Sequence, residues 1–192
     1  MVRLVTLFAA LTLAFPIWAA ELGDDGLHKA DWMRDTFKDL REDLEEANAE
    51  GKRLMLLIEQ RGCSYCAKMH REVFSDPDVD AFIRDNFFVV QINLHGDIEI
   101  VDLDGQELSE SQATQKWGML FTPSILYVSQ SATESQSAQQ AAVAVQPGAF
   151  SKGTTLDLMT WVVEERYALD NGEDFQRYHA RMIQERSDGS TD

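Results

Sequence analysis

The stretch that decides the fold is LMLLIEQRGCSYCAKMHREVF, residues 54–74. Its first five residues are apolar and predict a buried strand, Gly62 breaks the pattern, and the residues after Cys63 predict a helix. Cys63 and Cys66 are the only two cysteines of the chain. At a helix start, terminal amide groups and the helix dipole favour a thiolate, and a second cysteine one turn on can close a disulfide. The stretch therefore predicts a dithiol site for reversible disulfide exchange.

The two cysteines could instead form a structural disulfide, which is common in small secreted proteins. A bridge across two intervening residues closes a very small loop, however, so it constrains the unfolded chain little. A redox role is therefore favoured over a structural one.

Metal binding is the other alternative, because Cys63, Cys66, Met69 and His70 could together hold copper(I). Helical spacing carries His70 away from Cys63, so we expect Met69 in the core and His70 at the surface. Haem attachment of the common kind is excluded, since Ala67 follows the second cysteine where that motif has histidine. The other histidines have no ligand spacing and are expected at the surface: His28, His95 and His179. We therefore expect no metal and no cofactor.

Residues 1–20 have the pattern of a secretory signal peptide. Arg3 precedes an apolar segment from Leu4 to Ile17, and small residues allow cleavage after Ala19 or Ala20. An uncleaved anchor is the alternative. Export would leave about 170 residues, enough for one domain, which we expect to be soluble, periplasmic and monomeric.

The formal net charge is −16, with 33 acidic against 17 basic residues. This balance argues against nucleic acid and anionic membrane surfaces as partners. The acidic run at residues 42–46 is expected to be a solvated helix face.

The remaining pattern alternates helices and strands. Helices are expected at 24–50, 64–74, 107–117, 154–169 and 174–186, with a short one after the turn at 75–78; strands are expected at 54–58, 87–93, 124–128 and 141–145. The first two strands suit a parallel pair joined by a crossover. Residues 94–106 predict a loop or small hairpin. The low-complexity stretch 129–140 predicts a flexible loop with nothing to pack, and 187–192 a disordered tail, so the domain spans 21–186.

A strand followed by Cys-x-x-Cys and a helix, a later Thr122-Pro123 before a strand, and Gly148 before a closing helix together resemble the thioredoxin fold. Residues 59–70 are most similar to SoxW-like periplasmic thioredoxins. The resemblance implies an α/β fold with a central mixed sheet flanked by helices, here with extra N- and C-terminal helices. It covers roughly residues 37 to 167.

The resemblance also implies roles for single residues. Cys63 matches the exposed attacking cysteine, Cys66 the buried resolving one, and Thr122-Pro123 the cis-proline loop that pairs with a substrate chain. Tyr65, the second residue between the cysteines, is expected to contact substrate. Threonine before the proline is also similar to DsbC-type isomerases, which carry a dimerisation domain that the segment before the first strand is too short to supply.

This chain departs from thioredoxins around the cysteines, where Gly62 replaces the usual tryptophan and Ser64-Tyr65 the usual Gly-Pro. The buried acid of cytosolic thioredoxin corresponds to Leu57. Glu59, two residues along the same strand face, could replace it as proton acceptor for Cys66; an exposed strand-end glutamate is the alternative.

The sequence thus predicts an exported thiol–disulfide oxidoreductase that reduces protein disulfides. Ser64-Tyr65 brings no cation that would strongly depress the thiol pKa, which suits a reductant better than a dedicated oxidant. The resemblance implies a membrane thiol transporter of the CcdA or DsbD type as electron donor. A copper(I)-handling protein and an isomerase-like exchanger remain the alternatives.

Overall fold

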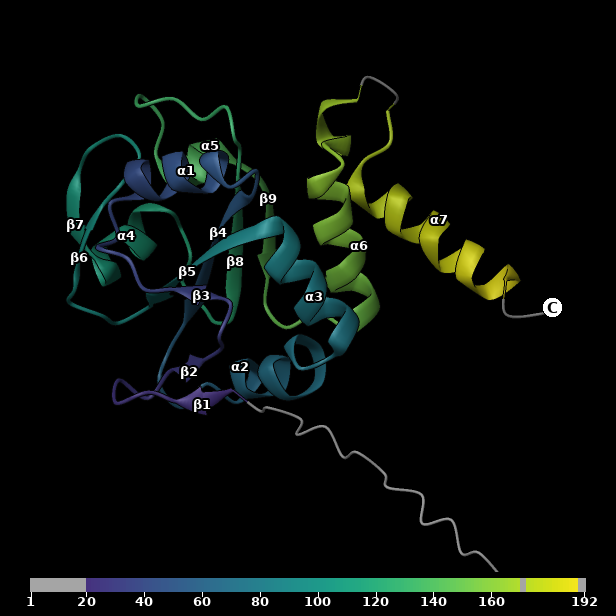
Figure 1. Ribbon diagram of the computed structural model, residues 1–192, viewed down its shortest axis with the longest axis horizontal. Coiled ribbons are helices and arrows are strands. Elements are labelled where there is room, and N and C mark those ends of the chain that lie inside the picture. The colour runs from purple at the N-terminus through teal and green to yellow at the C-terminus, as the bar shows by residue number, and fades with distance from the viewer. Residues whose placement is uncertain (1–19, 170–171, 190–192) are drawn as a thin grey trace, which may run out of the picture.

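The computed structural model describes residues 20–169 and 172–189 (Figure 1). The predicted signal peptide, except for Ala20, lies outside the described residues, as does the end of the predicted tail. Within the described part, no helix combines the length and the apolar character that crossing a bilayer requires.

A five-stranded mixed sheet forms the centre of the molecule, in the order β3-β5-β4-β8-β9. Strands β3, β5 and β4 run parallel, whereas β8 and β9 are antiparallel to their neighbours. The strands are β3 (Met33–Arg34), β4 (Arg53–Glu59), β5 (Phe87–Asn93), β8 (Ser124–Val128) and β9 (Ala142–Pro147). The expected parallel pair is therefore confirmed as β4 and β5, with the cysteine segment in the crossover between them.

Two hairpins extend the sheet region. One pairs β1 (Glu21–Leu22) with β2 (His28–Lys29), and the other pairs β6 (Glu99–Val101) with β7 (Glu107–Ser109). The second is the small hairpin expected after β5. Its last strand takes residues 107–109 from the predicted helix, which begins only at Glu110 because Ser109 forms a capping box with Gln112.

Helices cover both faces of the sheet (Figure 1). One face is covered by α1 (Leu40–Ala49), α4 (Glu110–Lys116) and α5 (Ala138–Ala141). The other is covered by α2 (Ser64–Met69), a π-helix (His70–Phe74), α3 (Pro77–Asn86) and α6 (Lys152–Val163), with a 3-10 turn (Arg166–Ala168) after α6 and α7 (Phe175–Asp188) packed against it.

Strand β4 shows how the sequence produces these two layers. Leu54, Leu56 and Ile58 point into the α1 layer, and Met55 and Leu57 into the α2 layer, all fully buried. A strand buried on both faces has no polar side to alternate with, which explains its continuous apolar run. The same alternation places Glu59 on the α2 side.

The predicted helix at 24–50 is wrong before residue 40. Residues 21–34 instead form β1, β2 and β3, and Gly26 and Lys38 adopt φ of +76° and +58°, which no helix accommodates. Helix α1 begins after Asp39, whose carboxylate accepts from the amides of Arg41 and Glu42. Phe37, which lies within the predicted helix, is 97% exposed.

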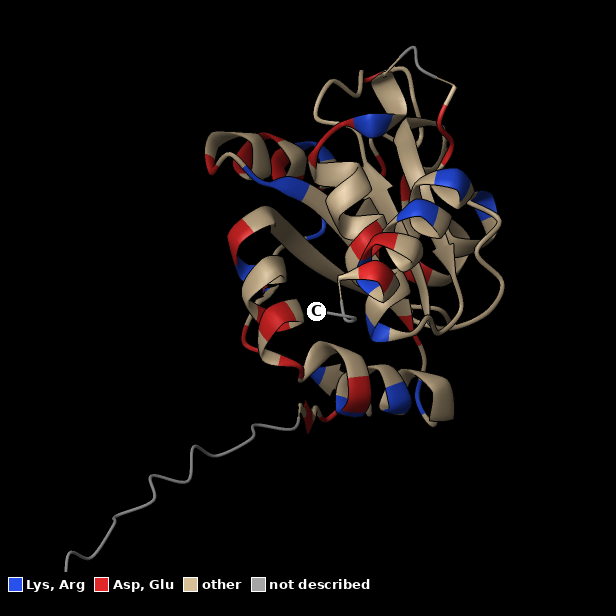
Figure 2. Ribbon diagram, turned by 90° about the vertical axis from the view of Figure 1, so that its right-hand side faces the viewer, with Lys and Arg blue, Asp and Glu red and all other residues tan. Residues whose placement is uncertain are grey.

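Three other expectations require correction. Asp43, in the acidic run at 42–46, is buried, while its acidic neighbours face solvent among the mixed charges that Figure 2 shows on the helices. The end of the stretch 129–140 does pack: Ser137 caps α5, Ala138 is fully buried, and the Ala138 amide donates to the buried Asp102 carboxylate. Helix α7 continues to Asp188, past the predicted domain end at 186.

Candidate active site

Cys63 and Cys66 are joined in a disulfide at the start of α2. Gly62 precedes them with φ of +73°, a conformation that glycine adopts without steric cost. Cys63 is the N-cap residue of α2, and its sulfur accepts a hydrogen bond of 3.0 Å from the Cys66 amide. A thiolate at Cys63 would receive the same bond, so the helix end is arranged to stabilise the charged sulfur.

The two cysteines are both buried, Cys63 included, but they differ in residual exposure. Cys63 is 8% exposed and Cys66 is 1% exposed. Cys63 also lines a hollow of about 340 Å³, and Cys66 does not. This asymmetry matches the order of roles that the sequence predicts, with the first cysteine attacking and the second resolving.

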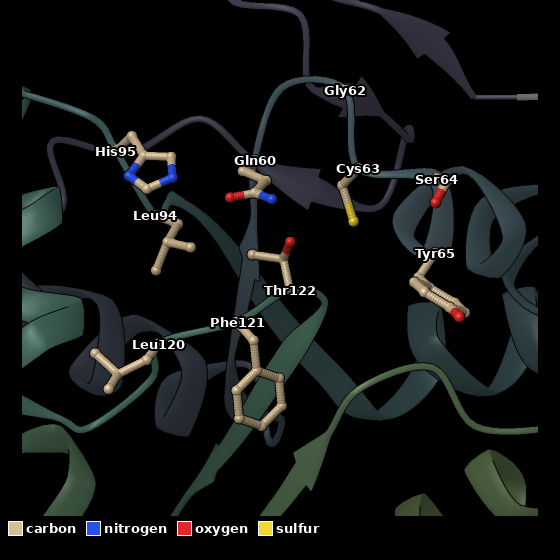
Figure 3. Close-up of a pocket in the computed structure, with 10 residues that line it drawn as sticks. All are labelled: Gln60, Gly62, Cys63, Ser64, Tyr65, Leu94, His95, Leu120, Phe121 and Thr122. Atoms are coloured by element: carbon tan, nitrogen blue, oxygen red, sulfur yellow. The ribbon is translucent and has the colours of Figure 1, made fainter.

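The other wall of the hollow is the loop before β8 (Figure 3). The Thr122–Pro123 peptide bond is cis, and the Pro123 carbonyl accepts from the Gly148 amide at 2.8 Å, which ties the loop to the end of β9. Figure 3 shows the Cys63 sulfur directed toward this loop, with Thr122 opposite. Tyr65 also lines the hollow and is 64% exposed.

Some residues of this hollow were missed by sequence reasoning. Leu120 and Phe121 are more than half exposed, and His95 lines the hollow from the segment after β5. The position of Phe121 directly before Thr122-Pro123 was an available signal, whereas His95 approaches only through the pairing of β5 with β4. Leu120 and Phe121 offer an apolar rim beside the disulfide.

Glu59 lies at the end of β4 and is 1% exposed, so the alternative of an exposed glutamate is wrong. Its carboxylate faces the His70 Nε2 at 3.0 Å and accepts from the Gln91 Nε2 at 2.7 Å. In this disulfide-bonded form, no described hydrogen bond joins Glu59 to Cys66. A proton-acceptor role for Glu59 therefore stays a prediction.

His70 is buried at 3% exposure, against the expected surface position. It lies one helical turn after Cys66, and residues four apart share a helix face, so the face that buries Cys66 also buries His70. Its ring is stacked on those of His28, at 4.7 Å, and Trp32, at 6.4 Å. Met69 is fully buried, as expected.

His28 is half-buried rather than at the surface, because the β1–β2 hairpin brings it against His70. Burial and the neighbouring His70 lower the pKa of His28, and the Glu59 carboxylate acts in the opposite direction. His95 is exposed as predicted.

The set of residues that could hold a metal differs from the one considered in the sequence. Among the described residues, one group of histidine, cysteine and acidic ligand atoms lies close together: His28, Glu59 and His70, within 4.8 Å of one another. Neither cysteine belongs to this group. The copper set of Cys63, Cys66, Met69 and His70 is thus not assembled, since the cysteines are joined to each other and His70 faces Glu59.

Arg61 does not supply a cation to Cys63. Its guanidinium donates to the backbone carbonyls of Asp24 and Asp25, which fastens the site loop to the β1–β2 hairpin. The thiolate of Cys63 must therefore depend on the helix end rather than on this side chain.

A mixed sheet with helices on both faces, a Cys-x-x-Cys disulfide at a helix start and a cis-proline loop beside it define a thioredoxin-type oxidoreductase scaffold. Residues 40–145, more than half of the chain, match the family described as a thioredoxin-like domain, and the chain belongs to this family. No curated protein matches the chain.

Solved structures share the fold. A thioredoxin-fold protein from Helicobacter pylori matches with a TM-score of 0.53 at 16% identity, over 72% of this chain and 86% of that one. A thioredoxin from Thermus thermophilus matches with a TM-score of 0.50 at 19% identity, over 65% of this chain and 83% of that one. At such identities these similarities establish the fold alone.

Proposed function

We propose that this protein is an exported thiol–disulfide oxidoreductase that reduces disulfides of other proteins. The observation that carries the proposal is the position of the Cys63–Cys66 disulfide, at the start of α2 and beside the cis Thr122–Pro123 loop. The family and the presence of a closed Cys-x-x-Cys pair support thiol–disulfide exchange in general.

The exchange proceeds in two displacements. The Cys63 thiolate attacks one sulfur of a substrate disulfide, a Cys63–substrate disulfide forms, and the other substrate sulfur leaves as a thiolate that takes a proton. Cys66, after losing its proton, attacks the Cys63 sulfur and releases the second substrate thiolate. The substrate gains two electrons, and the protein returns to the disulfide-bonded form described above.

Substrate binding in this scheme uses the apolar rim of the hollow. Leu120, Phe121 and Tyr65 are exposed around Cys63 and provide contact area for a polypeptide next to its disulfide. The polar groups of Thr122 lie at the same place; its Oγ1 is buried and has no hydrogen-bond partner among the described residues.

The direction of flux rests on the side chains described next to Cys63, none of which places a cation on its sulfur. The dipeptide Ser64-Tyr65 carries no charge, and Arg61 is held by the β1–β2 hairpin. In dedicated oxidants, a strongly stabilised thiolate favours the dithiol form over the disulfide. That stabilisation is lacking here, so we assign the protein as a reductase rather than an oxidant or isomerase.

A reductase must be recharged by a two-electron dithiol donor. The signal-peptide pattern of residues 1–20 and the similarity to SoxW-like proteins support a periplasmic location, where a membrane thiol transporter of the CcdA or DsbD type would be the donor. We also propose that the exported chain acts as a monomer.

The reduction potential of the pair tests this assignment. Equilibration with glutathione or dithiothreitol mixtures, followed by thiol alkylation, should give a value near about −270 mV, and insulin should be reduced by wild type but not by Cys63→Ser. A value near about −120 mV would assign the protein as an oxidant. Equal insulin reduction by wild type and Cys63→Ser would remove the pair from the activity altogether.

A further inference from the structure

A second cluster of chemically reactive side chains lies behind the disulfide and takes no part in the proposed exchange except through Glu59. It consists of His28 on β2, Glu59 at the end of β4 and His70 at the start of the π-helix, with ligand atoms all within 4.8 Å of one another. The three residues come from segments far apart in the chain, and Figure 1 shows β2 lying beside α2. The fold therefore assembles a two-histidine, one-carboxylate set that the sequence spacing conceals.

The burial of Glu59 is the first indication of a ligand. Its carboxylate is 1% exposed, and its described partners are the Gln91 amide and the His70 imidazole. The ammonium of Lys29 is bound instead to the Asp25 carboxylate, at 2.7 Å, and to the Gln91 carbonyl, at 2.6 Å. With Lys29 held by other groups, the buried Glu59 carboxylate faces the His70 ring nitrogen, which places two potential metal-ligand atoms side by side.

The bonding of His70 is the second indication. Its Nε2 lies 3.0 Å from the Glu59 Oε1, whereas its buried Nδ1 has no hydrogen-bond partner in the described part of the chain. His70 thus presents one ring nitrogen to the Glu59 carboxylate, and imidazole nitrogen is the commonest protein ligand for transition metals. In tetrahedral geometry, two ligand atoms on one zinc ion, with bonds of about 2.0–2.1 Å, stand about 3.3 Å apart. The Glu59 Oε1 and the His70 Nε2 are close to this separation, at 3.0 Å.

We propose that His28, Glu59 and His70 form a binding site for a divalent transition-metal ion of the Zn²⁺ type. The set matches zinc sites with two histidines, one glutamate and a water. Glu59 and His70 are already adjacent. The rings of His28 and His70 are stacked with an interplanar angle of 15°, so an ion in the plane of His70 lies outside the plane of His28. To complete the site, the half-buried His28 ring would have to turn from the stacked orientation seen here.

Occupation of the site would join the β1–β2 hairpin to the segment that follows the cysteines. The ion would replace the proton between Glu59 and His70, so no redox change is involved. The inference does not depend on disulfide reduction, and it can be tested in the disulfide-bonded protein, where Cys63 and Cys66 cannot bind metal.

The experiment is calorimetric titration of Zn²⁺ into chelator-treated, fully oxidised protein. We expect one ion per chain and an affinity at least 100-fold weaker in His28→Gln. His95→Gln is the matched control, since it removes an exposed histidine outside the cluster and should bind as wild type does. Circular dichroism verifies that each variant is folded.

A second measurement guards against a general loss of structure in the variants. Excess Zn²⁺ should raise the unfolding midpoint of oxidised wild type and of His95→Gln, but not that of His28→Gln, because ligands that bind only the folded state stabilise it. The proposal is overturned if oxidised wild type takes up no Zn²⁺, or if folded His28→Gln binds Zn²⁺ within threefold of wild type.

Discussion

Asp43 provides a quantitative test of how burial of a carboxyl group affects the pH dependence of this protein's stability. The side chain lies in the first half of α1 at 3% exposure, and its described hydrogen bond is from the Thr36 hydroxyl at 3.3 Å. Burial, with added repulsion from Asp39, Glu46 and Glu42, raises the pKa of this carboxyl from 3.8 to about 7, against the smaller effect of the Thr36 bond.

The raised pKa makes stability depend on pH in a definite direction. Between about pH 4 and pH 7 the unfolded chain releases the Asp43 proton while the folded chain retains it, so the free energy of unfolding falls as pH rises. A shift of about three units at about 1.4 kcal/mol each sets a ceiling of about 4 kcal/mol on the stability lost over this window. Below the unfolded-state pKa the stabilisation is fully present.

Asp43→Asn should remove this dependence, because asparagine has the same shape, remains uncharged and can still accept from Thr36. In urea unfolding of the oxidised protein, we expect the variant to match wild type within about 1 kcal/mol near pH 4 and to exceed it by about 1–4 kcal/mol at pH 8. Glu45→Gln, an exposed neighbour in α1, is the control and should show no such divergence. If the wild-type and Asp43→Asn stabilities run parallel from pH 4 to 8, the argument from burial is refuted.

Three further predictions concern single side chains. The Tyr127 hydroxyl is fully buried and has no hydrogen-bond partner among the described residues. Tyr127→Phe should therefore raise the free energy of unfolding by about 1 kcal/mol. Clear destabilisation in urea would show that the hydroxyl has a hydrogen-bond partner after all. Gly62→Ala should lower the free energy of unfolding by about 1–2 kcal/mol, because residue 62 has a positive φ. Gly153→Ala, within α6, should leave the free energy of unfolding unchanged or raise it by up to about 1 kcal/mol. Equal urea midpoints for the two variants would show that position 62 does not require glycine. Glu59→Gln should slow disulfide exchange at pH 7 at least tenfold in stopped-flow assays without changing alkylation of reduced Cys63, and an unchanged exchange rate would remove Glu59 as proton acceptor.

The sequence predicted the elements whose pattern is local. The apolar run of β4, the helix after Cys63 and the turn at residues 75–78 each carry their own signal, and the structure confirms all three. The cis Thr122–Pro123 bond came from family resemblance, since no local pattern distinguishes it from the far commoner trans form.

The sequence-based predictions were wrong where contacts between distant segments determine the local structure. Trp32 and Met33 lie within the predicted helix at 24–50, yet Met33 belongs to β3, which is held by pairing with β5, a partner more than fifty residues away. His70 was assigned to the surface because helical spacing carries it away from Cys63, and His28 because it has no ligand spacing with the other histidines. Only the β1–β2 hairpin and the burial of the Cys66 face of the helix bring them together over Glu59.

The account depends most on Cys63 forming a covalent bond with another polypeptide. The direct measurement is to reduce Cys66→Ser, mix it with a disulfide-bonded protein such as insulin, and analyse the products by non-reducing electrophoresis and mass spectrometry. We predict a dithiothreitol-sensitive conjugate through Cys63 that persists because no second sulfur resolves it, and none with Cys63→Ser, whose remaining sulfur is buried. Absence of a conjugate in folded Cys66→Ser, or equal conjugation through Cys66 in Cys63→Ser, would contradict the assignment.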